Sequence, residues 1–242
     1  MIEIQNLTKQ YKDVTAVKDL NLHIAKGELF ALLGVNGAGK TTTIKMLSCL
    51  AQPTEGDALI GGHSIRREPQ SVKELLGISP QETAVGPNLS VRENLELSCG
   101  IGGHDRAYAE RKTTELLQSF SLQEVAEKRA RKLSGGYQRR LSIAMALASE
   151  PQVLYLDEPT LGLDVLARRE LWKSIRALKG RITIILTTHY LEEAEALADR
   201  IGIMSRGQLI ALGTADELKT QTGAASLEDA FVALCEEGGT EE

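Results

Sequence analysis

Residues 29–42 read LFALLGVNGAGKTT, and this stretch decides the fold. Its first five residues are apolar and stop at Gly34, which is typical of a strand buried on both faces of a parallel sheet. Residues 34–41 match the pattern G-x-x-x-x-G-K-[ST], and residues 41–50 have helical character before Gln52 and Pro53 end the helix. A strand, a glycine-rich loop and a helix in this order predict a loop that cradles phosphate.

The residue types in this loop suit the binding of Mg-ATP. Glycine permits positive φ and lets backbone N–H groups approach phosphate oxygens, and the helix N-terminus favours anions. Lys40 supplies a point charge to the β- and γ-phosphates, and the Thr41 hydroxyl is the hard oxygen donor that Mg²⁺ prefers. The alternative is a glycine-rich turn with a chance lysine, which the flanking strand and helix disfavour. The predicted nucleotide contacts are Gly34, Asn36, Gly37, Ala38, Gly39, Lys40, Thr41 and Thr42.

The rest of the chain predicts a sheet covered by helices. The first 26 residues have the character of strands, because Ile2 and Ile4, and later Leu20, Leu22 and Ile24, alternate with polar residues; this indicates a small antiparallel sheet. Short strands are expected at residues 57–60, 153–156, 182–186 and 201–204, and helices at residues 168–178 and 192–198. From about residue 91 to residue 149 the spacing is almost entirely helical. This βαβ alternation predicts an α/β fold whose mainly parallel sheet is interrupted by a helical insert.

A second chemical signal is the strand at residues 153–156, which ends in Asp157 and Glu158. Consecutive strand residues point to opposite sides, so the two acids should have different roles. Asp157 can hold Mg²⁺, and Glu158 can polarise the water that attacks the γ-phosphate. The alternative is an exposed acidic turn before Pro159, which is less convincing beside a phosphate loop.

Composition limits the remaining classes of function. The 242 residues contain 28 basic and 33 acidic side chains, a net charge of −5, which argues against a nucleic-acid backbone as partner. The three cysteines have no metal spacing and are expected to be reduced thiols of a cytosolic protein. The start does not resemble a signal peptide, and no apolar run reaches the ~18 residues that cross a bilayer. Any membrane role is therefore expected to come through a partner.

A third signal is the sequence Leu133-Ser134-Gly135-Gly136. Ser134 is a good N-cap, and helical spacing starts just after it. The two glycines leave backbone N–H groups exposed at the start of that helix, which makes another anion site. An ordinary glycine-rich turn with a capped helix is the alternative for this motif taken alone.

Together these motifs resemble those of the ATP-binding subunit of an ATP-binding cassette (ABC) transporter. The resemblance runs from about residue 2 to residue 219 and depends on motifs in the family's order. Those motifs are Tyr11, the loop at residues 34–41, Gln81, the signature at Leu133, Asp157 with Glu158, Leu163 with Asp164, and His189. The resemblance implies a P-loop NTPase core with an N-terminal antiparallel subdomain and the helical subdomain, about residues 91–149, inserted. The ATP-binding domain would span residues 1–219, and a C-terminal helix and flexible tail residues 220–242.

The resemblance also implies roles for individual residues. Tyr11 would stack on adenine, His189 would hydrogen-bond the γ-phosphate, and Gln81 would contact Mg²⁺ or the attacking water and sense a transmembrane partner. The signature serine and glycines would touch the γ-phosphate of ATP held by a second subunit, and Asp164 would lie at that interface. The catalytic set is then Glu158, His189, Gln81 and Lys40, and the Mg²⁺ ligands are Thr41, Gln81 and Asp157.

The implied activity is ATP hydrolysis that powers a transmembrane permease subunit, with a second ATP-binding subunit completing the site as a homodimer and no nucleic acid. The chain would be cytoplasmic and peripheral on the inner face of the cell membrane. Residues 187–195 and 227–231 resemble the branch that exports drugs, lipids or polymers, although residues 227–235 also fit an amphipathic helix packing on its own domain. An ABC ATPase acting on ribosomes or nucleic acid, and a nucleotide-gated binding module, are the alternatives. Two positions depart from the family: Tyr137 replaces a usual glutamine, and Leu161 a usual serine.

Overall fold

The strand before the glycine-rich loop is β3 (Leu29–Leu33), and all five of its residues are buried. The computed structural model describes residues 1–237, which form two units. The first unit contains residues 1–76 together with the chain from residue 179 onward, and the second contains residues 77–178. The phosphate loop belongs to the first unit, whereas the carboxylate strand and the signature belong to the second.

In the first unit, β3 lies between two parallel neighbours. It pairs with β8 (Thr183–Thr188) on one side and β9 (Arg200–Ser205) on the other, and β10 (Gln208–Gly213) adds an antiparallel edge strand next to β9. All six residues of β8 are buried, as expected of a strand covered on both faces. The register pairs Leu33 with Thr188, so the chain leaves both strands at the same edge of the sheet.

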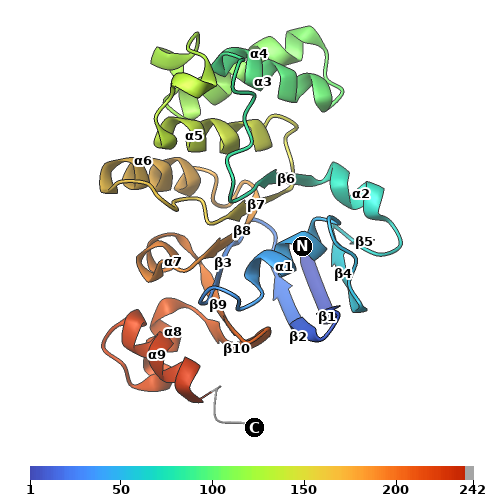
Figure 1. Ribbon diagram of the computed structural model, residues 1–242, viewed down its shortest axis with the longest axis vertical. Helices are drawn as coiled ribbons and strands as arrows, with labels where there is room; N and C mark the ends of the chain where they lie inside the picture. Colours follow the sequence, from blue (N-terminus) through green and yellow to red (C-terminus); the bar gives the residue numbers. More distant parts are fainter. Residues whose placement is uncertain (238–242) are drawn as a thin grey trace. The chain divides into compact units, whose positions relative to one another are not determined.

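The N-terminal strands form the predicted antiparallel sheet. β1 (Ile2–Tyr11) pairs with β2 (Val14–Ile24) and with β4 (Glu55–Ile60), and the short β5 (His63–Ser64) completes the order β2-β1-β4-β5. Figure 1 shows this sheet in blue and cyan, with α1 (Lys40–Leu47) in the same unit. One face is apolar because alternate residues such as Ile2, Ile4 and Ile60 are almost fully buried. The short helix α2 (Pro69–Glu74) follows this sheet.

Three further helices belong to the first unit. α7 (Leu191–Leu197) connects β8 to β9, and α8 (Ala215–Thr222) and α9 (Leu227–Glu237) follow β10. Leu227, Ala230 and Leu234 of α9 are buried, and α9 contacts α7, α8 and β10. The amphipathic-helix interpretation of this segment is therefore confirmed. The predicted flexible tail falls on residues 238–242, which lie outside the described residues.

The second unit is mainly helical, as predicted. It contains β6 (Leu76–Ser79), α3 (Val91–Ile101), α4 (Arg106–Ser119), α5 (Gly135–Ala146), β7 (Val153–Asp157) and α6 (Val165–Arg176). Two short 3₁₀ turns, Gln123–Val125 and Ala130–Lys132, connect α4 to α5. One face of α4 is apolar, with Leu116, Leu117 and the following Phe120 all buried, which fits the helical spacing of this stretch. No helix within residues 1–237 is long and apolar enough to cross a membrane.

The fold class is confirmed, but some elements differ from the predictions. The helix after the phosphate loop ends at Leu47 rather than at residue 50, and the strand before His189 runs over Thr183–Thr188 rather than residues 182–186. Three short strands, β5, β6 and β10, were not predicted. β5 and β6 contain two and four residues, too few to establish alternation, and β10 is an edge strand with a register shift.

A capping box fixes the start of α3, the first helix of the second unit. The Ser90 hydroxyl accepts a hydrogen bond from the Glu93 N–H at 3.1 Å, and the Glu93 carboxylate accepts from the Ser90 N–H at 2.6 Å. Beside it, the fully buried Asn94 side chain accepts from the Gly86 N–H at 2.7 Å and donates to the Ser90 carbonyl at 2.8 Å. These bonds order the loop that leads from Gln81 into α3.

We expect Ser90→Ala to lower the free energy of unfolding by about 1 kcal/mol, because the α3 N-terminus loses its cap. The matched control is Ser98→Ala in the same helix, which removes only a hydroxyl bond to the Asn94 carbonyl and should change stability by less than about 0.5 kcal/mol. Urea unfolding followed by circular dichroism measures both. Equal effects of the two variants would contradict the capping role.

Candidate functional site

The phosphate loop is held by close backbone contacts at two of its glycines. A Cβ on Gly34 would lie 2.5 Å from the Met204 carbonyl oxygen of β9, and a Cβ on Gly39 would lie 2.5 Å from the Ala16 carbonyl oxygen of β2. Gly39 also has a φ of 104°, which side chains rarely adopt. The loop is therefore wedged between two strands at positions where only glycine fits.

The middle of the loop faces outward. Val35, Asn36 and Gly37 are exposed, and a Cβ on Gly37 would meet no atom within 4 Å. Gly39 is the N-cap of α1, whose first residue is Lys40, so the N-terminal N–H groups of the helix begin at the loop. Thr41 and Thr42, in the first turn, are half-buried. This combination of open backbone and helix N-terminus can hold an anion.

Lys40 curls back over the loop. Its Nζ donates to the Gly34 carbonyl at 2.7 Å and to the Val35 carbonyl at 3.3 Å, and the residue is only 6% exposed. The charge thus sits above the same turn whose backbone the glycines leave open. A lysine held there can add a positive charge to a bound phosphate group.

His189 lies at the same edge of the sheet as the loop, because it follows Thr188, the partner of Leu33. Its ring is 4.1 Å from the ring of Tyr190, centroid to centroid, and the residue is half-buried. The parallel register of β3 and β8 is therefore what brings the predicted γ-phosphate contact to the phosphate loop.

Tyr11 ends β1 at the turn into β2 and is 46% exposed. The Lys9 ammonium lies 4.8 Å from the centre of its ring, a cation–π contact, and also donates to the Gln52 carbonyl at 2.6 Å. Although the Lys9 ammonium is close to the ring, Tyr11 is exposed enough for its ring to stack on a base.

The two acids of the second unit are both buried at the end of β7, with Asp157 5% and Glu158 6% exposed. The alternative of an exposed acidic turn is therefore wrong. Glu158 has a φ of 48°, the left-handed region that non-glycine residues seldom occupy. Such outliers persist where the surrounding structure enforces them, and they are frequent at functional sites.

Gln81 is exposed and lies two residues after β6. Its backbone carbonyl accepts a hydrogen bond at 3.4 Å from Arg139, a buried residue of α5 that the sequence analysis did not single out. Its position could have indicated a role, because helical spacing places Arg139 on the same inward face of α5 as Ser142, where an arginine is unusual.

The signature lies at the start of α5, as predicted. Ser134 occupies the N-cap position with a φ of −65° and ψ of 159°, but within the described residues its hydroxyl makes no capping hydrogen bond. The expected N-cap residue and helix start are therefore confirmed, although within residues 1–237 the hydroxyl does not make the capping bond that serine often makes at this position. Ser134 and Gly135 are both exposed, and a Cβ on Gly135 would meet nothing within 4 Å. The hydroxyl and the first backbone N–H groups of α5 thus face outward.

The residues that depart from the family pattern also have defined surroundings. The Arg140 guanidinium lies 4.4 Å from the centre of the Tyr137 ring, so the tyrosine is engaged in a cation–π contact. Leu161 is 41% exposed in the turn before α6. Asp164 is the N-cap of α6, where its carboxylate accepts from the Ala167 N–H at 2.9 Å. A local structural role for Asp164 therefore exists beside the interface role that the resemblance implies.

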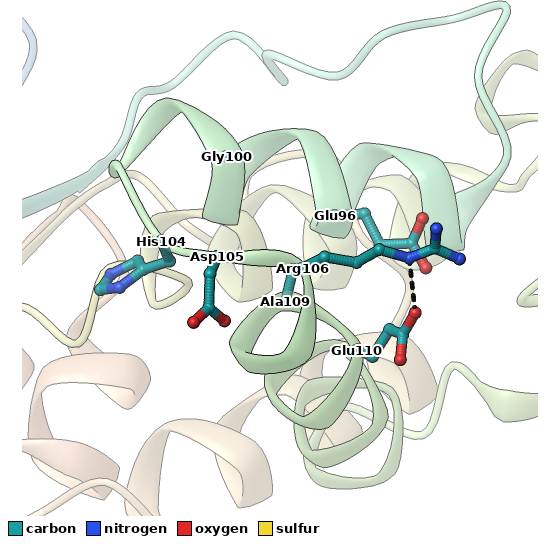
Figure 2. A pocket seen from close by; sticks show the side chains of 7 residues that line it. All are labelled: Glu96, Gly100, His104, Asp105, Arg106, Ala109 and Glu110. Atoms are coloured by element: carbon teal, nitrogen blue, oxygen red, sulfur yellow. Dashed lines mark hydrogen bonds and ion pairs between the residues drawn. The ribbon is translucent and has the colours of Figure 1, made fainter.

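A hollow of about 350 Å³ lies between α3 and α4 and contains none of the predicted site residues. Figure 2 shows its lining, in which Arg106 forms an ion pair with Glu110 at 2.9 Å, near Glu96 and Asp105. Next to it, burial and the nearby Glu150 carboxylate raise the pKa of Tyr108 to about 12. The ion pair neutralises the arginine, so the hollow offers little to an anionic nucleotide.

The structure thus places the predicted residues in two sets. The first unit brings together the phosphate loop and His189, and the second holds Gln81, the signature and the acid pair. Within the described residues, no group of three or more His, Cys, Asp or Glu side chains could hold a metal ion. The hydroxyl of Thr41, the amide of Gln81 and the carboxylate of Asp157 are oxygen donors of the kind that Mg²⁺ prefers.

We expect Gly39→Ala to cost about 1–3 kcal/mol more in free energy of unfolding than Gly37→Ala. Both positions have positive φ, but only the new methyl group at residue 39 would clash with the Ala16 carbonyl. Urea unfolding without nucleotide gives the comparison. If the two variants are equally stable, Gly39 does not wedge the loop against β2.

Comparison with known proteins agrees with this arrangement. Residues 17–161 match the family model described as ABC transporter. The chain is 44% identical to the daunorubicin resistance ATP-binding protein DrrA3 of Streptomyces coeruleorubidus, over 92% of this chain and 71% of that protein. It is 39% identical to the linearmycin resistance ATP-binding protein LnrL of Bacillus subtilis, over 92% of this chain and 72% of that protein.

Solved structures agree as well. An ATP-binding subunit of an ABC transporter has a TM-score of 0.86 and 32% identity, covering 97% of this chain and 99% of that one. A dimeric ATP-binding cassette in a post-hydrolysis state, bound to ADP and Pi, has a TM-score of 0.80 and 28% identity, covering 88% and 98%. The chain therefore belongs to the ABC transporter family, as an ATP-binding subunit that hydrolyses ATP.

Proposed function

We propose that this chain powers an exporter, that two copies close on two ATP molecules, and that hydrolysis lets them open. The observation that carries the proposal is that each chain has two separate anion-binding helix starts. The phosphate loop opens at α1, and the exposed Ser134 and Gly135 open at α5. A phosphate loop of one copy and a signature of the other would together enclose a triphosphate.

In this proposal the first unit binds most of the nucleotide. The loop backbone and Lys40 hold the β- and γ-phosphates, because both the open N–H groups and the ammonium lie over the same turn. Tyr11 stacks on adenine, for which its 46% exposure leaves room. His189 hydrogen-bonds the γ-phosphate from the neighbouring strand end. Tyr11 and His189 would thus contact the adenine and the γ-phosphate of the same ATP.

The second unit supplies the residues for hydrolysis. Glu158 orients and polarises the water that attacks the γ-phosphate, a task for which its carboxylate must be held in one direction. Asp157, Gln81 and the Thr41 hydroxyl would hold Mg²⁺, which neutralises charge on the phosphates when it is bound. Both acids are buried, so ordering them costs little at the moment of reaction.

The closed and open states would differ in their contacts with the γ-phosphate. With ATP present, Ser134 and the N–H groups of α5 in the partner copy bind that phosphate, and hydrolysis removes the contact. A transmembrane permease subunit would convert this cycle into movement of a substrate. The names of these relatives, which are drug-resistance proteins, favour export of a drug-like molecule. The chain would then lie on the cytoplasmic face of the membrane, and its net charge of −5 disfavours nucleic acid as a partner.

We expect Glu158→Gln to lower kcat for Mg-ATP by about 10²–10⁴-fold while ATP affinity is retained, because only the general base is lost. A coupled phosphate-release assay measures turnover, and binding of a fluorescent ATP analogue measures affinity. The control is Glu127→Gln, an exposed glutamate of the same unit that pairs with Arg92. Unchanged turnover in Glu158→Gln would overturn the assignment of the base.

We expect the Glu158→Gln chain to sediment as a dimer with Mg-ATP, because the bound ATP is no longer hydrolysed and the dimer stays closed. Adding Ser134→Glu should return it to a monomer, because a carboxylate at the start of α5 repels the partner's γ-phosphate. The single-chain affinity for ATP should remain, since Ser134 belongs to the other copy's site. Analytical ultracentrifugation with and without ATP tests both statements. A double variant that still dimerises would place the γ-phosphate away from the signature.

A further inference from the structure

Arg139 is a charged residue in the interior of the second unit. It lies in α5, five residues after Ser134, and is only 4% exposed. A buried guanidinium is costly unless it is hydrogen-bonded. Backbone carbonyls from two different loops provide such bonds, and both loops carry residues of the proposed catalytic set.

One edge of the guanidinium holds the acid loop. Nη2 donates to the Asp157 carbonyl at 2.7 Å, and Nε donates to the Pro159 carbonyl at 2.8 Å. These carbonyls lie immediately before and after Glu158, the residue with the left-handed backbone conformation. The two bonds therefore fix the turn on both sides of Glu158, and with it the direction in which its side chain leaves the backbone.

The remaining nitrogen holds the loop of Gln81. Nη1 donates to the Pro80 carbonyl in a short hydrogen bond and to the Gln81 carbonyl at 3.4 Å. A single planar group thus joins the backbone of Gln81 to the backbone around Glu158. Because the guanidinium is rigid, its nitrogens cannot move independently of one another.

The same face of α5 is attached to β6 at two further points. The Ser142 hydroxyl hydrogen-bonds the Ser79 hydroxyl at 3.0 Å, and both groups are buried. One turn further on, a Cβ on Gly77 would lie 2.2 Å from the Ala146 carbonyl, so strand and helix are in backbone contact. Residues 139, 142 and 146 have the i, i+3, i+7 spacing of one helix face. The helix that begins at the signature is therefore fixed along its length to the strand that leads to Gln81.

We propose that Arg139 is a positioning residue that holds Gln81 and Glu158 in register with the signature helix. The inference rests on the proposed roles of those two residues in hydrolysis. When the start of α5 engages the γ-phosphate of a partner copy, Arg139 transmits its displacement to both loops at once. Lysine could not replace it, because an ammonium is a compact point charge without the planar fork that spans the two loops.

The first test is hydrogen–deuterium exchange of the full-length chain without nucleotide, which does not depend on turnover. We expect Arg139→Ala to speed exchange at residues 81–82 and 158–161 together, with little change in α4. The control is Lys112→Met, which removes another largely buried cation of this unit, one paired with Glu115 and Glu150. If Arg139→Ala leaves both loops as protected as in the wild type, or if Lys112→Met exposes them equally, the proposal is wrong.

The second test is steady-state ATPase kinetics with Mg-ATP. We expect Arg139→Ala and Arg139→Lys to lower kcat by about 10–100-fold with little change in KM or in affinity for ATP, because misplaced catalytic groups slow the reaction while the phosphate loop is intact. Millimolar guanidinium chloride should restore part of the kcat of Arg139→Ala, whereas equal sodium chloride or urea should not. Wild-type kcat in both variants would overturn the proposal.

If Arg139→Ala does not fold, Arg139→Lys provides both measurements. A wild-type chain that lacks turnover would contradict the proposed function, and the exchange experiment would still decide whether Arg139 fixes the two loops. A kcat that falls only in proportion to the folded fraction, without rescue by guanidinium, would reduce Arg139 to a residue of general stability and reject the positioning role.

Discussion

The backbone contact that wedges the phosphate loop is the constraint on which the first unit depends. Gly34 touches the Met204 carbonyl of β9 and Gly39 touches the Ala16 carbonyl of β2, so the loop is closed by two strands from distant parts of the chain. The loop can then present N–H groups to a phosphate without a large loss of chain freedom on binding. The parallel register of β3 with β8 adds His189 to the same edge. The carboxyl ends of β3 and β8 thus bring the phosphate loop and His189 together.

In the second unit, backbone contacts fix the direction of a side chain rather than the path of a loop. A general base needs a fixed direction, and Glu158, the proposed base, lies in a left-handed turn whose flanking carbonyls, those of Asp157 and Pro159, accept hydrogen bonds from Arg139. The helix that provides the holding group, α5, leaves its own N-terminus exposed at Ser134. One helix therefore combines an open anion-binding end with an interior that is fixed to two loops. Rigid attachment of this kind suits a protein in which a contact at the N-terminus of α5 must change the position of loops further along the helix.

Much of the fold followed from local patterns. The continuous apolar run of β3 and its glycine-rich continuation were sufficient to predict strand, loop and helix, and the helical spacing of residues 91–149 predicted the helices α3, α4 and α5. The amphipathic face of α9 was also readable, because its buried residues repeat at helical spacing. The pattern failed for β5, β6 and β10, which are short or irregular edge elements whose identity depends on pairing rather than on side-chain alternation. The Ser134 hydroxyl likewise showed that a residue favoured at N-caps need not make the capping bond.

The sequence alone determined the family and the candidate residues for its chemistry, because a phosphate loop, a strand-end acid pair and a signature each need particular residue types at short, fixed spacing. It could not determine how residues far apart are held. Glu158 lies in a left-handed turn, and Arg139 joins the carbonyls on both sides of it to those of Pro80 and Gln81 through contacts across about 20 and 60 positions of the chain. Backbone carbonyls are present in every residue, so no sequence pattern marks the ones that a guanidinium will bind. Only the packing of α5 against the loops decided it.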